Sequence, residues 1–416
     1  MKMHRFNRAQ ALPLQLVLII PFILQIFGAV GLVGYLSFKN GQKAVNELAD
    51  QLMERTSHSV DQHLDAYLSI PHKIIQINAD AIQMGLLDVR DRETVAKYFW
   101  RQMQAYDLSY IGIGLTTGEE AGAGRYDGKT VTVDDWTNKP PNNCYTYATD
   151  NQGNRTKLMT VYDWDNFSMT WYTEPMKAGK PVWSRIYTWN YPGYPYIVAS
   201  AGRPIYDRNN QLLGMVGADI HLLKLSDFLR NMEASHAGQV FILERSGLLI
   251  ANSGTEKPFT LVKDEIQRLP AIASPNSAVR GVTQKLKQQF GDFRSITKTQ
   301  KIKFDLEGEL QYVRVAPWRD QYGLDWLVVV SVPENVFMAQ INANNRTTVL
   351  LCLGALAIAS VLGVFTSRWI TRPILRLNRA TEDMAAGHLD QTIEDSGIQE
   401  LNKLSASFNH MAGQLR

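Results

Sequence analysis

Two long runs without a charged residue constrain the fold of this chain most. Residues 12–36 and residues 347–366 consist mainly of Leu, Ile, Val, Phe, Ala and Gly. Each run is long enough, as a helix, to cross about 30 Å of hydrocarbon. The sequence therefore predicts two transmembrane helices, at residues 14–37 and 347–367.

A cleaved signal peptide is the alternative interpretation of the first run. Its apolar core would be only about 7–15 residues long and would end in small residues at a cleavage site. The run at residues 12–36 is longer, and it continues directly into a helical pattern. These features favour an uncleaved membrane anchor.

Basic residues set the orientation of the two helices. The leader before the first helix has three basic residues and no acidic one, and four arginines follow the second helix: Lys2, Arg5, Arg8, Arg368, Arg372, Arg376 and Arg379. Cytoplasmic segments of membrane proteins carry such an excess of Lys and Arg. Residues 1–13 and 368–416 are therefore predicted to be cytoplasmic, and residues 38–346 to be extracytoplasmic.

Composition and cysteine content exclude several classes of protein. The formal net charge is only +3, which does not favour a nucleic-acid partner. Cys144 and Cys352 fall in different compartments on this topology, so no intrachain disulfide is expected. Two cysteines alone do not supply the four ligands of a structural zinc site, and the sequence contains no Cys-x-x-Cys or His-Glu-x-x-His motif. We therefore expect no metal and no cofactor.

The extracytoplasmic region begins with a long amphipathic helix and continues as short strands. Apolar residues recur at helical spacing between Val45 and Leu68, and Pro71 is expected to interrupt or kink the helix. From residue 105 onward the pattern changes to β-type runs separated by turn residues. Antiparallel sheet is predicted for residues 108–115, 158–162, 181–188, 196–206 and 211–219, then a helix near 221–233, then strands at 239–244, 247–252, 310–318 and 325–333.

Three phrases in this region resemble the double Cache architecture of bacterial receptors, in which two PAS-like units stack along one helix. They are GRPIYDRNNQLLGMVGADIHL (202–222), GQVFILERSGLLIANSG (238–254) and DWLVVVSVPENVF (325–337). The resemblance implies an α+β fold, with a membrane-distal unit at about residues 90–235 and a proximal unit at about 236–335.

Aromatic residues are concentrated where a ligand would bind. Eleven of them lie between Tyr162 and Tyr196, among them Trp164 and Trp189. Aromatic rings with a polar tip can form the wall of a small-molecule pocket or stack on a cation. The alternative is that they pack the core of a small domain.

The resemblance identifies candidate ligand-binding residues in the distal unit. Trp171, Tyr172, Tyr187 and Asp219 match the pattern of amino-acid-binding members, with Tyr162 and Trp189 as further candidates. Two positions depart from that pattern, because Met169 replaces an arginine and Trp189 replaces an aspartate.

The missing arginine would clamp the carboxylate of an amino acid. The sequence therefore favours an amine, a quaternary cation or a neutral planar compound. Arg185 or Arg203 would have to supply the missing charge from elsewhere. A structural alternative for Asp219 is that it caps a helix beginning near His221.

After the second apolar run, residues 368–416 resemble a HAMP domain. Apolar residues step by three and four in two segments separated by Gly387: Ile374, Leu377, Thr381 and Met384, then Leu401, Leu404, Phe408, Met411 and Leu415. The resemblance implies a parallel coiled coil in a homodimer, which would bury both seams as a four-helix bundle. Leu389 and Ile393 would be its connector residues, while Ser396 to Gln399 depart from the usual entry to the second helix.

These features together predict a receptor of the bacterial inner (plasma) membrane that binds a small ligand outside and signals inside. No catalytic residues are expected, because the sequence has no nucleophile elbow or phosphate-binding loop. The expected partners are the ligand, the lipid bilayer, a second copy, and an output domain or partner protein. The alternatives are the sensory half of a histidine kinase or a nucleotide or diguanylate cyclase, and a binding or adhesion protein that does not signal.

Overall fold

The computed structural model describes residues 13–137, 140–191, 194–263, 265–388, 390 and 392–415. Two compact units divide the chain. One unit comprises residues 47–337, and the other comprises the flanking segments up to residue 46 and from residue 338 onward. The predicted leader lies almost entirely outside the described residues.

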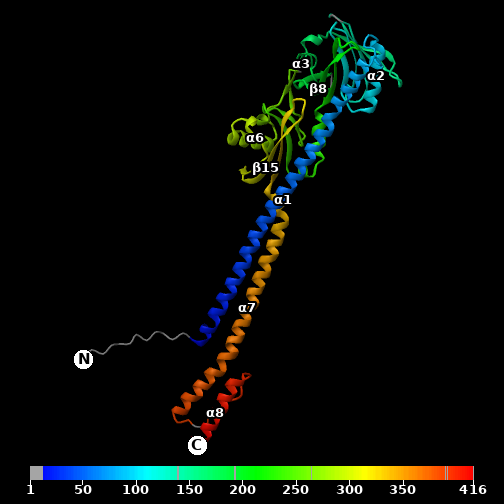
Figure 1. The fold of residues 1–416 in the computed structure, drawn as a ribbon. Helices are drawn as coiled ribbons and strands as arrows, with labels where there is room; N and C mark the ends of the chain where they lie inside the picture. Colours follow the sequence, from blue (N-terminus) through cyan, green and yellow to red (C-terminus); the bar gives the residue numbers. More distant parts are fainter. Residues whose placement is uncertain are drawn as a thin grey trace, which may run out of the picture. The chain divides into compact units, whose positions relative to one another are not determined.

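The first helix, α1 (Leu14–Gln83), is continuous across Pro71 (Figure 1). The predicted interruption at Pro71 is therefore wrong. A proline inside a helix removes one backbone hydrogen bond, but Leu68, Ile74 and Ile75 on either side of Pro71 are buried. The contacts of these side chains hold both sides of the proline in the helix.

The distal unit, residues 92–237, has a nine-stranded antiparallel sheet among the described residues. Its strand order is β5-β4-β3-β2-β1-β9-β8-β6, with β7 also paired to β8. The strands are β1 (Tyr110–Leu115), β2 (Glu120–Gly124), β3 (Thr132–Trp136), β4 (Cys144–Thr149), β5 (Arg155–Tyr162), β6 (Val182–Trp183), β7 (Tyr187–Tyr191), β8 (Tyr194–Tyr206) and β9 (Leu212–His221). The predicted strand–turn–strand at residues 202–222 is the β8–β9 hairpin.

Short helices accompany this sheet. Asp91 caps α2 by accepting a hydrogen bond from the backbone N–H of Thr94, as acidic N-cap residues commonly do. The helices are α2 (Arg92–Ala105), η1 (Asn166–Ser168), α3 (Thr170–Ala178), α4 (Leu223–Arg230) and α5 (Glu233–Ala237).

The proximal unit, residues 239–333, has a five-stranded antiparallel sheet in the order β11-β10-β16-β15-β14. The predicted strands at residues 239–244 and 325–333 have the same bounds in the structure. The elements are β10 (Gln239–Glu244), β11 (Leu249–Asn252), β12 (Phe259–Val262), β13 (Glu265–Arg268), η2 (Ala271–Ala273), α6 (Ser277–Phe290), η3 (Phe293–Ser295), β14 (Gln300–Leu306), β15 (Glu309–Arg319) and β16 (Asp325–Pro333).

The core of the proximal unit is apolar and buried. Phe241 and Val329 from the sheet are fully buried with Leu286 from α6. Side chains alternate along β10, β15 and β16, so one face of the sheet supplies this core.

The other unit contains α7 (Glu334–Ala385) and α8 (Gln399–Leu415). Among the described residues, two helices are long and apolar enough to cross a membrane, α1 from Leu16 and α7 from Arg346. The helix α7 ends at Ala385, just before Gly387, whose φ of +93° favours glycine.

The connector to α8 is held by side-chain amides. Asn409 on α8 bonds both the backbone N–H and the carbonyl of Ile393, each at 2.9 Å. Asn402 accepts from the Ser396 hydroxyl at 2.9 Å. The other predicted connector residue, Leu389, lies outside the described residues.

Candidate ligand-binding site in the distal unit

Glycines form the floor of the site. Glycines alternate with other residues along β1 and β2, and they lie on the same face of the sheet. They are Gly112, Gly114, Gly122 and Gly124. A Cβ atom on Gly112 or Gly122 would lie only 2.3 or 2.1 Å from the Tyr110 hydroxyl oxygen. The absence of side chains at these positions lets aromatic rings lie across the strands.

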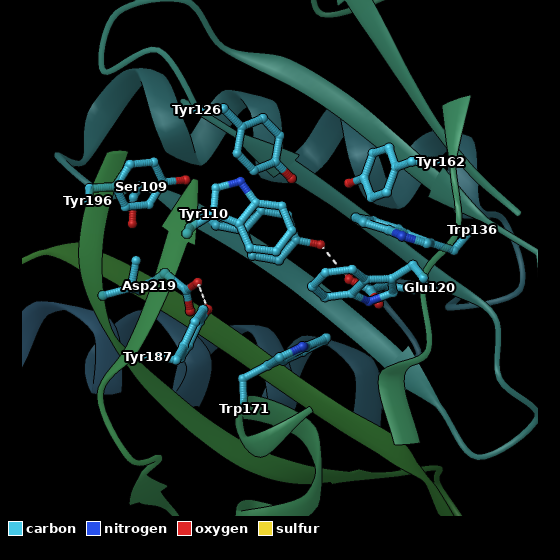
Figure 2. Close-up of a pocket in the computed structure, with 13 residues that line it drawn as sticks. Ser109, Tyr110, Glu120, Tyr126, Trp136, Tyr162, Trp171, Tyr187, Tyr196 and Asp219 are labelled. Carbon is cyan, nitrogen blue, oxygen red and sulfur yellow. Dashed lines mark hydrogen bonds between the residues drawn. The ribbon is translucent and has the colours of Figure 1, made fainter. Parts of the chain in front are cut away.

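Aromatic side chains enclose a cavity above this floor (Figure 2). The space between them is about 30 Å³, which is close to the volume of one water molecule. A larger ligand would therefore have to move some of these rings apart. The lining residues are Ser109, Tyr110, Glu120, Tyr126, Trp136, Tyr162, Trp164, Trp171, Tyr187, Trp189, Tyr196, Val198 and Asp219.

The pairing of the strands brings distant residues to this cavity. Asp219 on β9 is paired with Tyr110 on β1, and Glu120 on β2 is paired with both Gly114 and Trp136. Trp171 comes from α3, which packs on β8 and β9. The edge strand β7 adds Tyr187 and Trp189.

Three buried carboxyl groups lie in or beside the cavity, and each accepts a hydrogen bond from a tyrosine. The Tyr110 hydroxyl donates to Glu120 at 2.7 Å, and the Tyr126 hydroxyl donates to Asp134 at 2.6 Å. Tyr187 donates to Asp219, as the dashed line in Figure 2 marks. Glu120 and Asp134 are at most 1% exposed, and Asp219 is 7% exposed.

Burial dominates the electrostatics of these carboxyls. Burial raises the pKa of Asp219 to about 6, although hydrogen bonding to Ser200 and Tyr187 opposes the rise. Burial also raises the pKa of Asp134 to about 6, against hydrogen bonds from Thr146 and Tyr126 and the charge of Arg155. For Glu120, burial raises the pKa well above its usual range, and the charges of Asp134 and Asp219 add to that shift.

Basic side chains are absent from the lining within the described residues. The two arginines that the sequence offered as substitutes have other partners. Arg185 forms an ion pair with Glu174 at 2.6 Å, and its side chain is 81% exposed. Arg203 donates a hydrogen bond to Gln76 on α1. The cavity is therefore acidic and aromatic, which makes it electrostatically complementary to a cation.

A second hollow adjoins the first and shares four aromatic residues with it. Tyr126, Tyr162, Trp164 and Trp189 line both. The rings of Trp164 and Trp189 meet edge to face, with centroids 5.0 Å apart. These four side chains stand between the buried cavity and the outer hollow.

The structure brings five of the six predicted binding residues together at the cavity: Tyr162, Trp171, Tyr187, Trp189 and Asp219. Tyr172 is not in the lining and instead packs with Trp171 and Met215. The alternative role of Asp219 as a helix cap is wrong, because Asp219 lies within β9 and the next helix begins at Leu223 with Leu222 as its N-cap.

Sequence reasoning missed Tyr110, Glu120 and Asp134. The two acids lie on strands outside the aromatic-rich segment, and nothing local marks them as buried. A usable signal was the alternation of glycine in YIGIG (110–114) and EAGAG (120–124). Alternate glycines on two neighbouring strands leave one sheet face open to rings from elsewhere.

Two family models match this chain. Residues 41–341 match the family model of the Cache domain, and residues 365–416 match that of the HAMP domain. These matches confirm the double Cache and HAMP resemblance.

Two curated relatives are methyl-accepting chemotaxis proteins. TlpA of Bacillus subtilis is 25% identical over 262 residues, which cover 61% of this chain and 33% of that protein. PctB of Pseudomonas aeruginosa is 22% identical over 256 residues, which cover 61% of this chain and 36% of that protein. The chain thus spans about a third of the length of these relatives.

Among solved structures, the ligand-binding domain of Pseudomonas aeruginosa PctB in complex with L-Gln is similar with a TM-score of 0.41 and 15% identity. The match covers 74% of this chain and 98% of that domain. The family-model match extends over most of the present chain. The chain therefore belongs to the Cache domain family, as a sensor protein with a C-terminal HAMP region.

Proposed function

We propose that this chain is a transmembrane receptor whose distal cavity binds a small organic cation, such as a primary or quaternary amine. The observation that carries the proposal is the cavity itself. It has two buried carboxyls in its lining and a third beside it, with no basic residue among the described lining residues.

A cation is the ligand that best offsets the electrostatic cost of this cavity. Two or more buried carboxyls without a basic partner disfavour ionisation of one another. A bound ammonium group would favour the ionised form of Asp219 and form an ion pair with it. The ring faces of Trp171, Trp189 and Tyr110 would add cation–π attraction.

A free α-amino acid suits the cavity less well. Its carboxylate would need a basic partner, but Met169 takes the place of the expected arginine and Arg185 is paired with Glu174. The carboxylate would also lie among like charges, which costs free energy in a buried site.

The second part of the proposal is a relay through a dimeric HAMP bundle. Leu404 and Met411 on α8 are 52% and 46% exposed in the single chain. They belong to the apolar seam of α8, and pairing with a second copy would bury them. Residues 38–346 would lie outside the bacterial inner membrane, between the two transmembrane helices.

The output is proposed to lie in a further domain or a partner protein. The relatives named above are chemotaxis proteins, and the sensor histidine kinase WalK of Bacillus subtilis is 28% identical over 92 residues. The chain would then be the sensory part of a chemoreceptor-type protein, with a histidine kinase or a cyclase as the alternative.

Calorimetric titration of the chain in detergent micelles tests the ligand class. The panel contains primary and quaternary amines, their uncharged alcohol isosteres, carboxylates and amino acids. We expect binding of at least one amine, with affinity at least about a hundredfold weaker in Asp219→Asn because a buried charge pair is lost.

Asp227→Asn is the matched control, since the side chain of Asp227 is 68% exposed on α4. It should leave the affinity unchanged. Binding of carboxylates or ordinary amino acids in preference to every amine would contradict the proposal.

A further inference from the structure

One segment of the distal unit serves both the cavity and the neighbouring unit. Residues 170–191, here called the closing segment, contain α3, β6 and β7. Three of its side chains line the cavity, namely Trp171, Tyr187 and Trp189. In Figure 2, Trp171 and Tyr187 lie on the same side of the cavity as Asp219.

The same segment contacts the proximal unit at two places. The indole Nε1–H of Trp183 donates to Asp320 Oδ2 at 2.5 Å, and the Trp183 backbone N–H donates to the carbonyl of Tyr322 at 3.2 Å. The strand β13 of the proximal unit also lies beside β7. The closing segment therefore joins the two sheets.

Asp320 is well fixed as an acceptor. Its Oδ1 accepts the backbone N–H groups of Tyr322, Gly323 and Leu324, at 3.0, 2.8 and 2.8 Å. These bonds hold the turn between β15 and β16, and they leave Oδ2 for the indole of Trp183. Because the Asp320 side chain is already held in place, little further conformational entropy is lost when it accepts the hydrogen bond from Trp183.

A histidine of α1 completes the junction. The ring of His72 stacks on Tyr322 with centroids 3.5 Å apart, and it meets Trp183 edge-on at 4.8 Å. Burial, with a smaller effect of the Arg203 charge, lowers the pKa of His72 to about 3. The ring is therefore uncharged at neutral pH, and neither of its nitrogens hydrogen-bonds the Asp320 carboxylate.

We propose that Asp320, a residue of the proximal unit, is a positioning residue for the ligand cavity of the distal unit. Its hydrogen bond to Trp183 holds the closing segment against β8 and so keeps Tyr187 and Trp189 in place. This inference deepens the proposed function, because it assigns part of the control of that cavity to the other Cache unit. By reciprocity, a ligand that orders the closing segment strengthens the junction with the proximal unit.

Hydrogen–deuterium exchange of the full chain in nanodiscs, without any ligand, tests the proposal. Trp183→Phe removes the indole donor but keeps an aromatic ring against His72. We expect the amides of β7 to exchange about fivefold faster, which corresponds to the loss of one hydrogen bond worth about 1 kcal/mol. The amides of the β15–β16 turn should keep their rates.

Trp318→Phe is the matched control. Its indole also donates to a carboxylate, Asp65 on α1, at 2.9 Å, and the side chain is 5% exposed. This bond does not involve the closing segment, so β7 should exchange at the wild-type rate. Unchanged exchange of β7 in Trp183→Phe, or an equal increase in both variants, overturns the proposal.

Asp320→Asn provides a second, independent variant. An asparagine still accepts bonds within the turn through its oxygen, but its other side-chain atom is a donor and cannot accept from Trp183. The double variant with Trp183→Phe should exchange no faster than either single variant, since all three lose the same bond. Additive effects would overturn the proposal.

A ligand measurement separates this inference from the proposed function. With an amine that binds, Trp183→Phe should weaken the affinity about fivefold and Trp318→Phe should not. If no amine binds, the proposed ligand class fails, while the exchange experiment still decides the role of Asp320.

Discussion

The distal and proximal units share an antiparallel sheet plan but use one sheet face in opposite ways. In the proximal unit that face carries Phe241, Val313 and Val329, which are buried in one apolar core with residues of α6. In the distal unit the corresponding surface combines glycines with aromatic rings that line a small cavity. The difference teaches that the side chains on one face decide whether a Cache sheet carries a continuous apolar core or a candidate binding site.

Charge distinguishes the two units as clearly as shape. In the proximal unit two acids have basic partners, with Arg245 bonded to Asp325 at 2.8 Å and Arg268 bonded to Glu244 at 3.0 Å. In the distal cavity Glu120 and Asp219 have neutral hydrogen-bond partners, Tyr110 and Asn166 for Glu120 and Tyr187 and Ser200 for Asp219. Buried carboxyls without a charged partner cost stability, and the proposed cation would supply that partner.

The largest effect is expected from emptying the proximal core. Phe241→Ala should lower the free energy of unfolding by about 3–5 kcal/mol, because it removes a fully buried ring and leaves a cavity. Chemical denaturation measures this loss. Cation affinity of the folded fraction should be unchanged, and a large fall in that affinity would break the division of roles between the two units.

A methyl group added to the glycine floor of the distal cavity should affect cation binding more than stability. In Gly122→Ala the new Cβ would lie 2.1 Å from the Tyr110 hydroxyl oxygen. The displaced ring should cost about 1–3 kcal/mol of stability, as in other overpacked sites, and should abolish cation binding in a titration. Gly413→Ala on α8, where a Cβ meets nothing within 4 Å, is the control for an added methyl.

The dependence of stability on pH should come from the distal unit. Asp219 and Asp134 have a pKa near 6 when folded and near 4 when unfolded, so the folded state binds more protons between those values. These two carboxyls should then lower stability as the pH rises from about 4 to 6, by on the order of 1 kcal/mol each. The buried His72 and His221, whose pKa is lowered by burial, contribute in the opposite direction toward pH 7.

Thermal unfolding across that pH range, compared between wild type and Asp219→Asn, measures the contribution of Asp219. Relative to the variant, the wild type should lose stability as the pH rises, while its cation affinity should increase as Asp219 loses its proton. The same pH dependence of stability in both proteins would contradict the raised pKa of Asp219.

The smallest effect is expected from a paired charge. Arg268→Gln in the proximal unit should lower stability by about 0.5–1 kcal/mol, because its bond to Glu244 is partly exposed to solvent. Denaturation in low and high salt would show whether the loss shrinks with screening. An effect on cation binding is not expected.

The sequence predicted local elements well and long-range neighbours poorly. The alternation in QVFILE (239–244) and the apolar run at 325–333 were sufficient to give both strands their observed bounds. The prediction at Pro71 was wrong because it rested on the low helix propensity of proline. The packing of α1 on the sheets outweighs that propensity, and the helix is continuous.

The residues of the candidate site were also only partly predictable from the sequence. Trp171, Tyr187 and Asp219 could be proposed because aromatic density and a family pattern marked them. Glu120 reaches the cavity only through the pairing of β2 with β1 and β3. No local signal in the sequence specifies that register, so the acidic character of the site emerged only from the structure.

The central claim is that the charge of the ligand determines binding in the distal cavity. The most direct measurement is a calorimetric titration of the chain at pH 7.5 with three ligands of the same size and shape, which differ only in carrying an ammonium, a hydroxyl or a carboxylate group. We expect the cation to bind at least about a hundredfold more tightly than the alcohol, and the anion not to bind. Equal binding of the cation and the alcohol, or preference for the anion, would contradict the account.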